Sequence, residues 1–237
     1  NMKPIRILCL VIIFISNNLI AQNIPVDRPN IVWIMLEDWG LDLGCYGTKG
    51  IETPVTDQLA TEGMRYTNAF CTSPVCSTSR SAMITGFHQN YIGAEQHRTA
   101  KEDRKSLPYG IKPMPLLLQE AGYFTALMLY NKTDANFKGD LGFMGKDWKE
   151  REKGQPFFAQ ITLGGTHRQW NRDAKNPIDP NDIELPPYYV DTPFARRDWA
   201  NGLEQMQICD REIGDILKRL DKEGLSQNTL VFLIGDN

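Results

Sequence analysis

The chain has 237 residues, of which 41% are hydrophobic and 23% charged, so its composition is that of an ordinary globular protein and excludes a disordered or fibrous one. Its formal net charge of −3 excludes the broad basic surface that holds a nucleic-acid backbone, and we expect no nucleic-acid partner. An anionic substrate stays compatible with this charge, because a few convergent cations and a metal can form a local positive pocket in an acidic protein.

The N-terminal segment has the pattern of a secretory signal peptide. Lys3 and Arg6 precede an apolar run over residues 7–15, and Ala21 stands at a plausible cleavage position. The apolar run is interrupted before it reaches the roughly 20 residues that span a bilayer, which disfavours a membrane anchor. We therefore predict a signal peptide over residues 1–21, no stable membrane span, and an exported protein, either periplasmic or secreted.

The next predicted element is a strand over residues 31–36, an unbroken apolar run rich in β-branched side chains. Runs of this kind form central strands of parallel sheets, because helices cover both of their faces. Glu37 and Asp38 follow the run directly. Since open α/β sheets bind ligands beyond the carboxyl ends of their strands, we expect function at these two acids.

Helices and strands alternate over the middle of the chain. A helix is predicted with Thr53 as its N-cap, Pro54 at its first position and Gly63 at its end. The elements expected after it are a short strand over 64–70, a helix over 79–85 ended by Gly86, a helix over 116–121 and a buried strand over 123–129. This alternation predicts an α/β fold with a doubly wound, mostly parallel sheet flanked by helices.

The last third of the chain is predicted to supply two more strands and a long helix. One strand covers residues 157–163 and the other residues 229–234. The segment 168–193 is rich in Pro, Asn and Asp, which predicts a long surface loop over the site. Apolar side chains at helical spacing predict a helix over 196–224. No domain boundary is visible, so we interpret residues 22–237 as part of one domain.

Oxygen-bearing side chains follow the first and the last of these strands. The set consists of Glu37, Asp38, Asp236 and Asn237. The two strands would lie side by side in a parallel sheet, which would bring the set together. Three carboxylates and an amide suit a hard divalent cation, Ca²⁺ first and Mg²⁺ second. The alternative is that the first pair caps a loop and the second is an exposed polar pair.

Cysteines are expected to remain at four positions after signal removal, namely Cys45, Cys71, Cys76 and Cys209. This number permits two disulfides in an oxidising compartment, although a small buried hydrophobe is the simpler interpretation for most of them. Cys76 stands apart, because it lies in the segment Pro-Val-Cys-Ser-Thr-Ser-Arg over residues 74–80.

This segment resembles the active-site signature of the type I sulfatases, a family of the alkaline-phosphatase-like superfamily. The similarity extends in order over residues 29–47, 53–70, 74–86, 123–134, 166–167 and 228–237. It implies the fold of that superfamily and the hydrolysis of a sulfate ester, either a sulfated carbohydrate or a small sulfate ester. Family members continue past the Asp-Asn pair with a further lysine, more strands and a small C-terminal domain, so we expect the chain to be truncated before these parts.

The resemblance implies that Cys76 is oxidised to formylglycine by a formylglycine-generating maturation enzyme. The hydrated aldehyde has two hydroxyls on one carbon, of which one attacks sulfur and the other later expels sulfate, so a difficult hydrolysis is divided into two steps. Residue 76 would also be a metal ligand, because the cation would hold the diol and a sulfate oxygen. Arg80, one helical turn further on, would hydrogen-bond to residue 76 and offset its charge.

The resemblance also implies roles for side chains after other strands. Lys132 would supply a cation to the sulfate, and His167 would bind the sulfate or protonate the leaving alcohol. Asp134 stands where the family commonly has a histidine, and a carboxylate there can act as a base. Arg168 and Trp170, which follow His167, could form part of a sugar subsite, or they could be ordinary surface residues.

The chain departs from the family pattern at Glu37, which is usually aspartate, at Thr78, which is usually proline or alanine, and at Asp134. Two alternative functions stay open. One is a phosphate or phosphonate ester hydrolase of the same superfamily, against which the all-oxygen ligand set argues, because such enzymes more often use Thr or Ser with zinc and histidine ligands. The other is a non-catalytic glycan-binding homologue.

Overall fold

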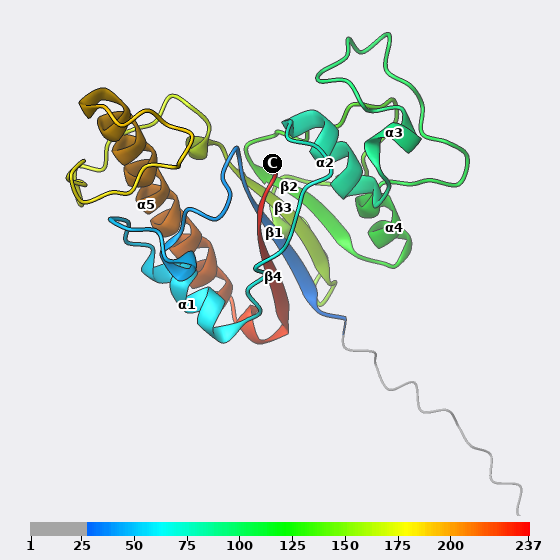
Figure 1. Cartoon of the computed structure of the whole chain (residues 1–237). Helices are drawn as coiled ribbons and strands as arrows, with labels where there is room; N and C mark the ends of the chain where they lie inside the picture. Colours follow the sequence, from blue (N-terminus) through cyan, green and yellow to red (C-terminus); the bar gives the residue numbers. More distant parts are fainter. Residues whose placement is uncertain (1–27) are drawn as a thin grey trace, which may run out of the picture.

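A parallel sheet forms the centre of the protein in a computed structural model that describes residues 28–237 (Figure 1). The predicted signal peptide over residues 1–21 lies outside the described residues. The sheet has four strands in the order β2-β3-β1-β4, and all neighbouring pairs are parallel. Their bounds are Asn30–Leu36 for β1, Phe124–Leu129 for β2, Phe157–Leu163 for β3 and Thr229–Gly235 for β4.

The register of the sheet brings the ends of its strands to one edge. Leu36 ends β1 and lies beside Leu163 and Gly235, which end β3 and β4. Leu129 ends β2 and pairs with Thr162, one residue before the end of β3. Consequently, the residues that follow the strands emerge at the same edge, as the predicted parallel sheet requires.

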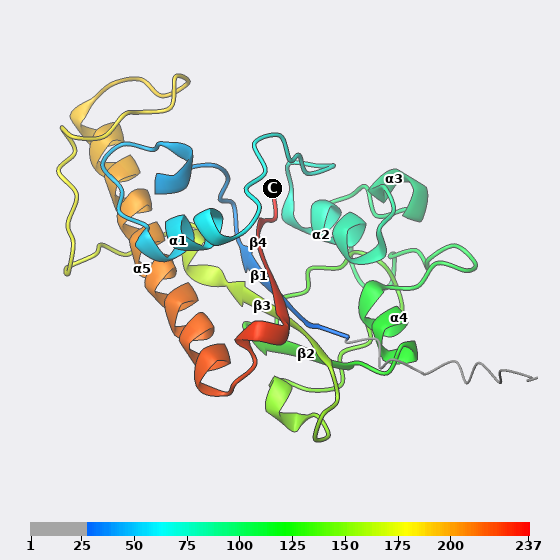
Figure 2. The same ribbon diagram turned by 90° about the horizontal axis from the view of Figure 1, so that it is seen from below.

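Helices cover both faces of the sheet, which confirms the doubly wound α/β prediction (Figures 1 and 2). One face carries α1 (Pro54–Glu62) and α5 (Pro193–Lys222), and the other carries α2 (Cys76–Thr85), α3 (Gln89–Ile92) and α4 (Met114–Glu120). The main core forms where buried side chains of α5, among them Trp199, Leu203, Met206 and Ile213, join those of the strands. None of the described helices is both long and apolar enough to cross a membrane.

The start of α2 and the cap of α1 differ from the prediction. Helix α2 begins at Cys76 and not at Ser79, and the Thr78 hydroxyl supports this first turn by donating to the Val75 carbonyl at 2.8 Å. Residue 76 is therefore the first helical residue. At the start of α1, Pro54 occupies the first position as predicted, but the Thr53 hydroxyl accepts from the Gly44 amide at 2.8 Å and does not cap its own helix.

The predicted strand over residues 64–70 is wrong. The segment has no strand pairing among the described residues, and Met64, Tyr66 and Phe70 are exposed. Its alternating apolar pattern suits a strand, but a strand forms only where a neighbour accepts its backbone hydrogen bonds.

The segment 168–193 is a long irregular loop, as predicted, but it does not cover the site beyond its first residues. It lies along α5 instead (Figure 1). Ile178 and Ile183 are buried with α5 in the main core, and the Glu204 carboxylate of α5 accepts from the backbone amides of Asp173 and Ile178 at 2.8 and 3.0 Å. Apolar burial and satisfied backbone groups hold the loop against the helix.

Candidate active site

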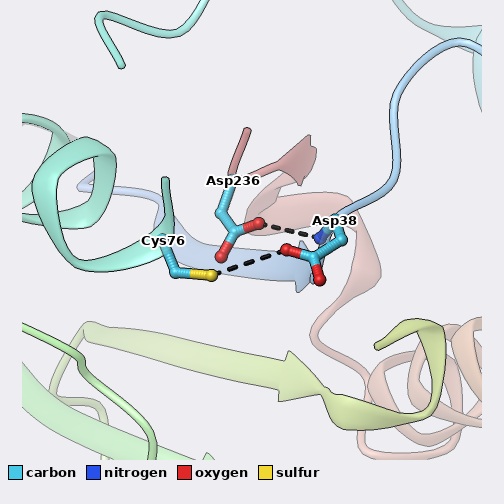
Figure 3. A group of neighbouring side chains, drawn as sticks. All are labelled: Asp38, Cys76 and Asp236. Carbon is cyan, nitrogen blue, oxygen red and sulfur yellow. Dashed lines mark hydrogen bonds between the residues drawn. The ribbon is translucent and has the colours of Figure 1, made fainter. Parts of the chain in front are cut away.

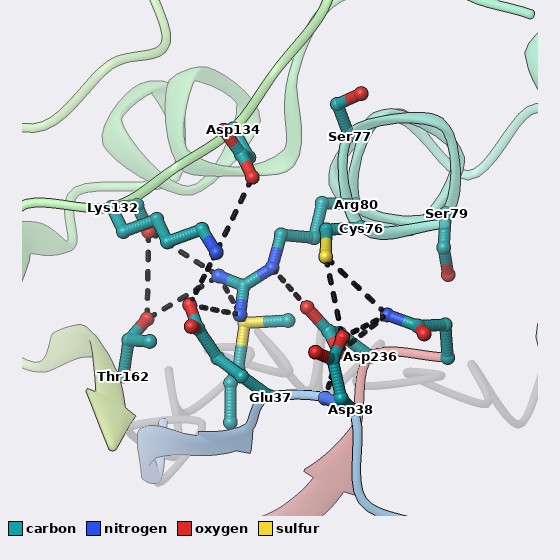
Figure 4. A network of polar contacts seen from close by, with 12 residues as sticks. Glu37, Asp38, Cys76, Ser77, Ser79, Arg80, Lys132, Asp134, Thr162 and Asp236 are labelled. Atoms are coloured by element: carbon teal, nitrogen blue, oxygen red, sulfur yellow. Dashed lines mark hydrogen bonds and ion pairs between the residues drawn. The ribbon is translucent and has the colours of Figure 1, made fainter. Parts of the chain in front are cut away.

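Polar side chains gather at the carboxyl edge of the sheet, where the strands and the start of α2 meet (Figure 4). The fold brings together every predicted site residue, namely Glu37, Asp38, Cys76, Arg80, Lys132, Asp134, His167, Asp236 and Asn237. Hydrogen bonds within this set join residues as far apart in sequence as Asp38 and Asn237, which are separated by 199 positions. The shared edge of a parallel sheet explains how these distant segments converge.

Asp38, Cys76 and Asp236, which we call the acid–cysteine group, face one another (Figure 3). A ligand atom from each lies within 4.8 Å of the other two. Cys76 Sγ is 3.5 Å from Asp38 Oδ1, and Asp236 Oδ1 accepts from the Asp38 amide at 3.0 Å. Asp38 has a φ of 51°, a left-handed conformation that side chains rarely adopt, and its bond to Asp236 helps to hold it there.

The side chains around the acid–cysteine group have the chemistry of a site for a hard cation. Two carboxylates point at one small volume, and the Asn237 amide lies beside them, with Nδ2 at 3.4 Å from Asp38 Oδ1 and 2.8 Å from Asp236 Oδ1. A flip of that amide would present its oxygen instead. Oxygen ligands of this kind fit Ca²⁺ or Mg²⁺ and do not resemble a structural zinc site.

Glu37 lies next to the acid–cysteine group but directs its carboxylate elsewhere. Its Oε1 accepts from Lys132 Nζ at 2.7 Å and from Arg80 Nη2 at 3.3 Å, and its backbone amide donates to Thr166 Oγ1 at 2.7 Å. Glu37 was predicted as a metal ligand, but its carboxylate lies outside the acid–cysteine group and pairs with Lys132 and Arg80. The longer side chain of glutamate, compared with aspartate, suits this reach.

Arg80 is buried at the centre of the site, with 2% of its side chain exposed. Its Nε donates to Asp236 Oδ2 at 2.6 Å, and its Nη1 donates to Thr162 Oγ1 at 3.4 Å and to the Lys132 carbonyl at 3.3 Å. Among the described residues, no side-chain hydrogen bond joins Arg80 to the Cys76 thiol, and a bond from Arg80 to residue 76 in its formylglycine form stays a prediction. The guanidinium pairs with the carboxylates of Asp236 and Glu37, and with its bond to Thr162 it ties α2 to the ends of β4, β1 and β3.

All four cysteines in the described part of the chain are free. No disulfide therefore joins them. Burial raises the pKa of the Cys76 thiol, and the charges of Asp236 and Asp38 raise it further. Such surroundings hold a thiol in its protonated form, whereas reactive cysteines lie in electropositive surroundings that favour the thiolate.

Lys132 and Asp134 form a line of alternating charges with Glu37 and with Arg98, a residue that sequence reasoning missed. Lys132 Nζ lies 3.4 Å from Asp134 Oδ2, and Arg98 Nη2 donates to the same oxygen at 3.0 Å. Burial lowers the pKa of Lys132, but the hydrogen bond and charge of Glu37 outweigh it and leave that pKa raised. No motif surrounds Arg98, so only the folded chain reveals it.

The pKa of Asp134 follows from these contacts. Burial alone would raise it, but the hydrogen bond from Arg98 and the charge of Lys132 outweigh burial and hold the pKa below its ordinary value. A carboxylate with a lowered pKa is a weak base. We predicted a general base at this position. The geometry instead favours a role in which Asp134 positions the two cations, Lys132 and Arg98.

The lowered pKa of Asp134 predicts a pH dependence of stability. The pKa of Asp134 in the folded state lies below its ordinary value of 3.8. The ionised carboxylate therefore stabilises the folded protein fully above pH 3.8, and this stabilisation is lost as the pH falls through the lowered pKa. When the pH is lowered from about 6 to about 3, we expect the free energy of unfolding, measured by urea titration, to fall less for Asp134→Asn than for the wild type. Asp103→Asn, at an exposed carboxylate, is the control. Equal losses in wild type and Asp134→Asn would contradict this assignment.

His167 lies at the mouth of the site, after β3. Its Nε2 is 3.5 Å from Asp38 Oδ2, and its side chain is half exposed. Arg168 stacks over the Trp170 ring at 4.2 Å and pairs with Asp198 at 2.8 Å, while the Trp170 indole donates to the Thr166 carbonyl at 2.8 Å. An imidazole next to the acid–cysteine group and open to solvent can reach a bound substrate.

Comparisons with known proteins agree with this geometry. The family model named Sulfatase matches residues 29–148 and 129–237. The ulvan-active sulfatase of Formosa agariphila is 28% identical over 89% of this chain and 44% of its own length, and the N-acetylgalactosamine-6-sulfatase of Mus musculus is 34% identical over 96% of this chain and 54% of its own length. The chain spans about half the length of the curated relatives it matches.

Solved structures share the fold. One from Bacteroides thetaiotaomicron, reported in work on the metabolism of multiple glycosaminoglycans, has a TM-score of 0.70 at 18% sequence identity, and it covers 88% of this chain and 61% of its own. At this level of identity the match shows the fold alone. It agrees with the parallel sheet and the flanking helices described above.

Proposed function

Because the chain belongs to the sulfatase family, we propose that the protein hydrolyses sulfate esters, with a formylglycine made from Cys76 and a divalent cation at the acid–cysteine group. The observation that carries the proposal is the convergence of Asp38, Cys76 and Asp236 within 4.8 Å at the edge where the strands end. A nucleophile position next to two carboxylates, with buried Arg80 behind it, suits an anionic reaction that needs a cation.

Formylglycine would supply a geminal diol as the nucleophile, and Ca²⁺ or Mg²⁺ would supply a Lewis acid for the diol and the sulfate. Asp38, Asp236 and the Asn237 amide would hold the cation. Arg80 orients the Asp236 carboxylate, because its Nε donates to Oδ2 of that group at 2.6 Å. Asp38, Asp236 and Asn237 would therefore be the metal ligands, and the Arg80 guanidinium would orient one of them, Asp236.

Lys132 and His167 would act on the substrate itself. The Lys132 ammonium, held by Glu37 at 2.7 Å, would bind a sulfate oxygen and offset the charge of the ester. His167, which is half exposed and 3.5 Å from Asp38, would donate a proton to the alcohol oxygen as that oxygen leaves. We propose a sulfated saccharide as substrate, since one relative is named for a sulfated sugar, N-acetylgalactosamine.

The maturation of residue 76 would precede folding. Only 7% of Cys76 and 2% of Thr78 is exposed, and the Thr78 hydroxyl lies 2.6 Å from Ser73 Oγ. A maturation enzyme cannot reach these side chains in the folded protein. We propose that the enzyme acts on the unfolded segment, during or before an export directed by the N-terminal residues.

Turnover of a chromogenic aryl sulfate by the full-length protein, produced in cells that mature sulfatases, tests the function. We expect hydrolysis of the sulfate, much slower hydrolysis of the matching aryl phosphate, and loss of activity with a chelator that added Ca²⁺ restores. Ca²⁺ at a hundred times its Kd should also stabilise the folded state by about 2.7 kcal/mol, and Asp236→Asn should reduce this gain. Absence of turnover by material with confirmed formylglycine would refute the proposal.

A further inference from the structure

Arg98 stands at the rim of the site, outside the residues assigned above to the metal, the nucleophile or the sulfate. Its Nη2 donates to Asp134 Oδ2 at 3.0 Å, and 49% of its side chain is exposed. Within residues 28–237, its guanidinium forms no other hydrogen bond or ion pair. A planar guanidinium with several N–H donors open to solvent is suited to bind an anion besides Asp134, such as a charged group of a ligand.

The backbone of Arg98 is anchored beside the nucleophile position. Its amide donates to Ser77 Oγ at 3.0 Å, and Ser77 follows Cys76 in the first turn of α2. The same hydroxyl lies 3.0 Å from His97 Nδ1. Arg98 has a φ of 50°, in the left-handed region that a large side chain rarely adopts, so the surrounding contacts must hold it in place.

Asn136 supplies the remaining contacts that hold the segment around Arg98. It is buried, and its side chain donates to the Gln96 carbonyl at 2.6 Å and accepts from the Thr99 amide at 2.9 Å. Its own amide donates to Ser81 Oγ of α2 at 2.8 Å. A satisfied, buried polar network therefore fixes the residues on both sides of Arg98, which distinguishes it from a mobile surface arginine.

The charges near Arg98 leave room for an anion. Asp134 Oδ2 is shared between Arg98 and Lys132, so one carboxylate lies between two cations. Lys132 is also bound to Glu37 and lies deeper in the site, with 20% of its side chain exposed. Arg98 is consequently the outer and more exposed of the two cations.

We propose that Arg98 is a specificity-determining residue that binds a second anionic group of the substrate, a carboxylate or a sulfate on the saccharide that bears the ester to be cleaved. This inference rests on the proposed sulfatase function. The inner cation serves the reacting sulfate, and the guanidinium at the rim reaches substituents further out. Asp134 holds the Arg98 guanidinium in position, and the remaining N–H donors of the guanidinium form bidentate hydrogen bonds to the anion.

The test compares substrates with and without a second anion. The full-length protein and its Arg98→Ala variant are assayed on an aryl sulfate, on a sulfated disaccharide with a uronic acid, on its carboxyl-reduced form, and on a disulfated disaccharide without a carboxylate. We expect Arg98→Ala to lower kcat/KM about 10- to 100-fold for a substrate with the matching anion, mainly through KM, and to change the aryl sulfate less than about threefold. Arg98→Lys should recover part of the loss.

Arg197→Ala is the matched control, because Arg197 has 41% of its side chain exposed and pairs with the carboxylate of Glu204 on α5, away from the site. Its kinetics should equal those of the wild type. The disaccharide that suffers the larger loss identifies the anion as carboxylate or sulfate. Equal losses on the disaccharides and the aryl sulfate, or no loss on any of them, would overturn the assignment of Arg98.

A binding measurement separates this inference from the sulfatase function. Calorimetric titration of the same disaccharides into Cys76→Ala, with and without Arg98→Ala, needs no formylglycine and no turnover. We expect Arg98→Ala to weaken binding of the matching disaccharide about 10- to 100-fold and to leave the carboxyl-reduced one unchanged if the anion is the carboxylate. Unchanged affinities would refute the role of Arg98 even if the enzyme is active, whereas weakened binding by an inactive protein would refute only the catalytic proposal.

Discussion

Cys76→Ser is expected to reduce aryl sulfate turnover by the full-length protein at least about a thousandfold, the scale on which removal of a nucleophile acts. Serine is close in size to cysteine, so it should preserve the contacts of this buried position with Asp38 and Asn237. It has one hydroxyl on its carbon, however, and has no easy means of releasing a sulfate once it is bound. The loss should therefore appear in steady-state kcat with little change in folding, as measured by circular dichroism.

The chemical state of residue 76 is checked on the same protein. Mass spectrometry of the tryptic peptide that contains residue 76 should find an aldehyde in place of the thiol, although Thr78 occupies a position that the maturation enzyme reads. Cys45→Ser, at a half-buried thiol outside the site, should leave kcat/KM unchanged. An intact Cys76 thiol in all of the material, together with full turnover, would contradict the assignment.

Arg80→Met is expected to destabilise the protein by about 3–5 kcal/mol and to abolish turnover. The substitution keeps an unbranched side chain but leaves the buried Asp236 without its 2.6 Å partner, and Glu37 keeps only Lys132. A buried carboxylate without a partner carries a large desolvation cost, and the ligand geometry at the acid–cysteine group would be lost as well. Urea denaturation measures the first effect and aryl sulfate kinetics the second.

Conservative and distant variants show whether the guanidinium itself is required. Arg80→Lys keeps the charge but cannot bond Asp236, Glu37 and Thr162 together, so it should recover only part of the stability. Lys112→Met, which breaks an exposed pair with Glu120, should leave the denaturation midpoint unchanged. An Arg80→Met protein with wild-type stability would show that the buried pairs contribute nothing to folding.

Residues that follow strands could be placed from the amino-acid pattern. The apolar runs before Glu37 and before Asp236 were long and β-branched enough to indicate buried parallel strands, and β1 and β4 are indeed neighbours with Leu36 beside Gly235. Because neighbouring parallel strands end at the same edge of a sheet, acids that directly follow two such strands come together once the strands pair.

Contacts between side chains of different segments could not be placed in this way. The bonds from the Arg80 guanidinium to Asp236 and Glu37 were not predicted, since a long side chain pairs with the carboxylates that the fold places around it. For the same reason Asp134, expected as a base, lies between Lys132 and Arg98. Ion-pair partners depend on distances across the fold, which no local pattern contains.

Hydrophobic periodicity along the chain was sufficient for the four strands of the sheet and for its doubly wound arrangement, because burial of apolar faces is decided within each element. The place of Cys76 beside the acids was implied by the family resemblance. Periodicity was not sufficient for residues 64–70, which have a strand pattern but no pairing partner, or for the loop that lies along α5. Only the tertiary structure decided the conformation of these two segments. It also decided the line of alternating charges from Glu37 through Lys132 and Asp134 to Arg98, because ion pairs form between the groups that the folded chain brings within reach.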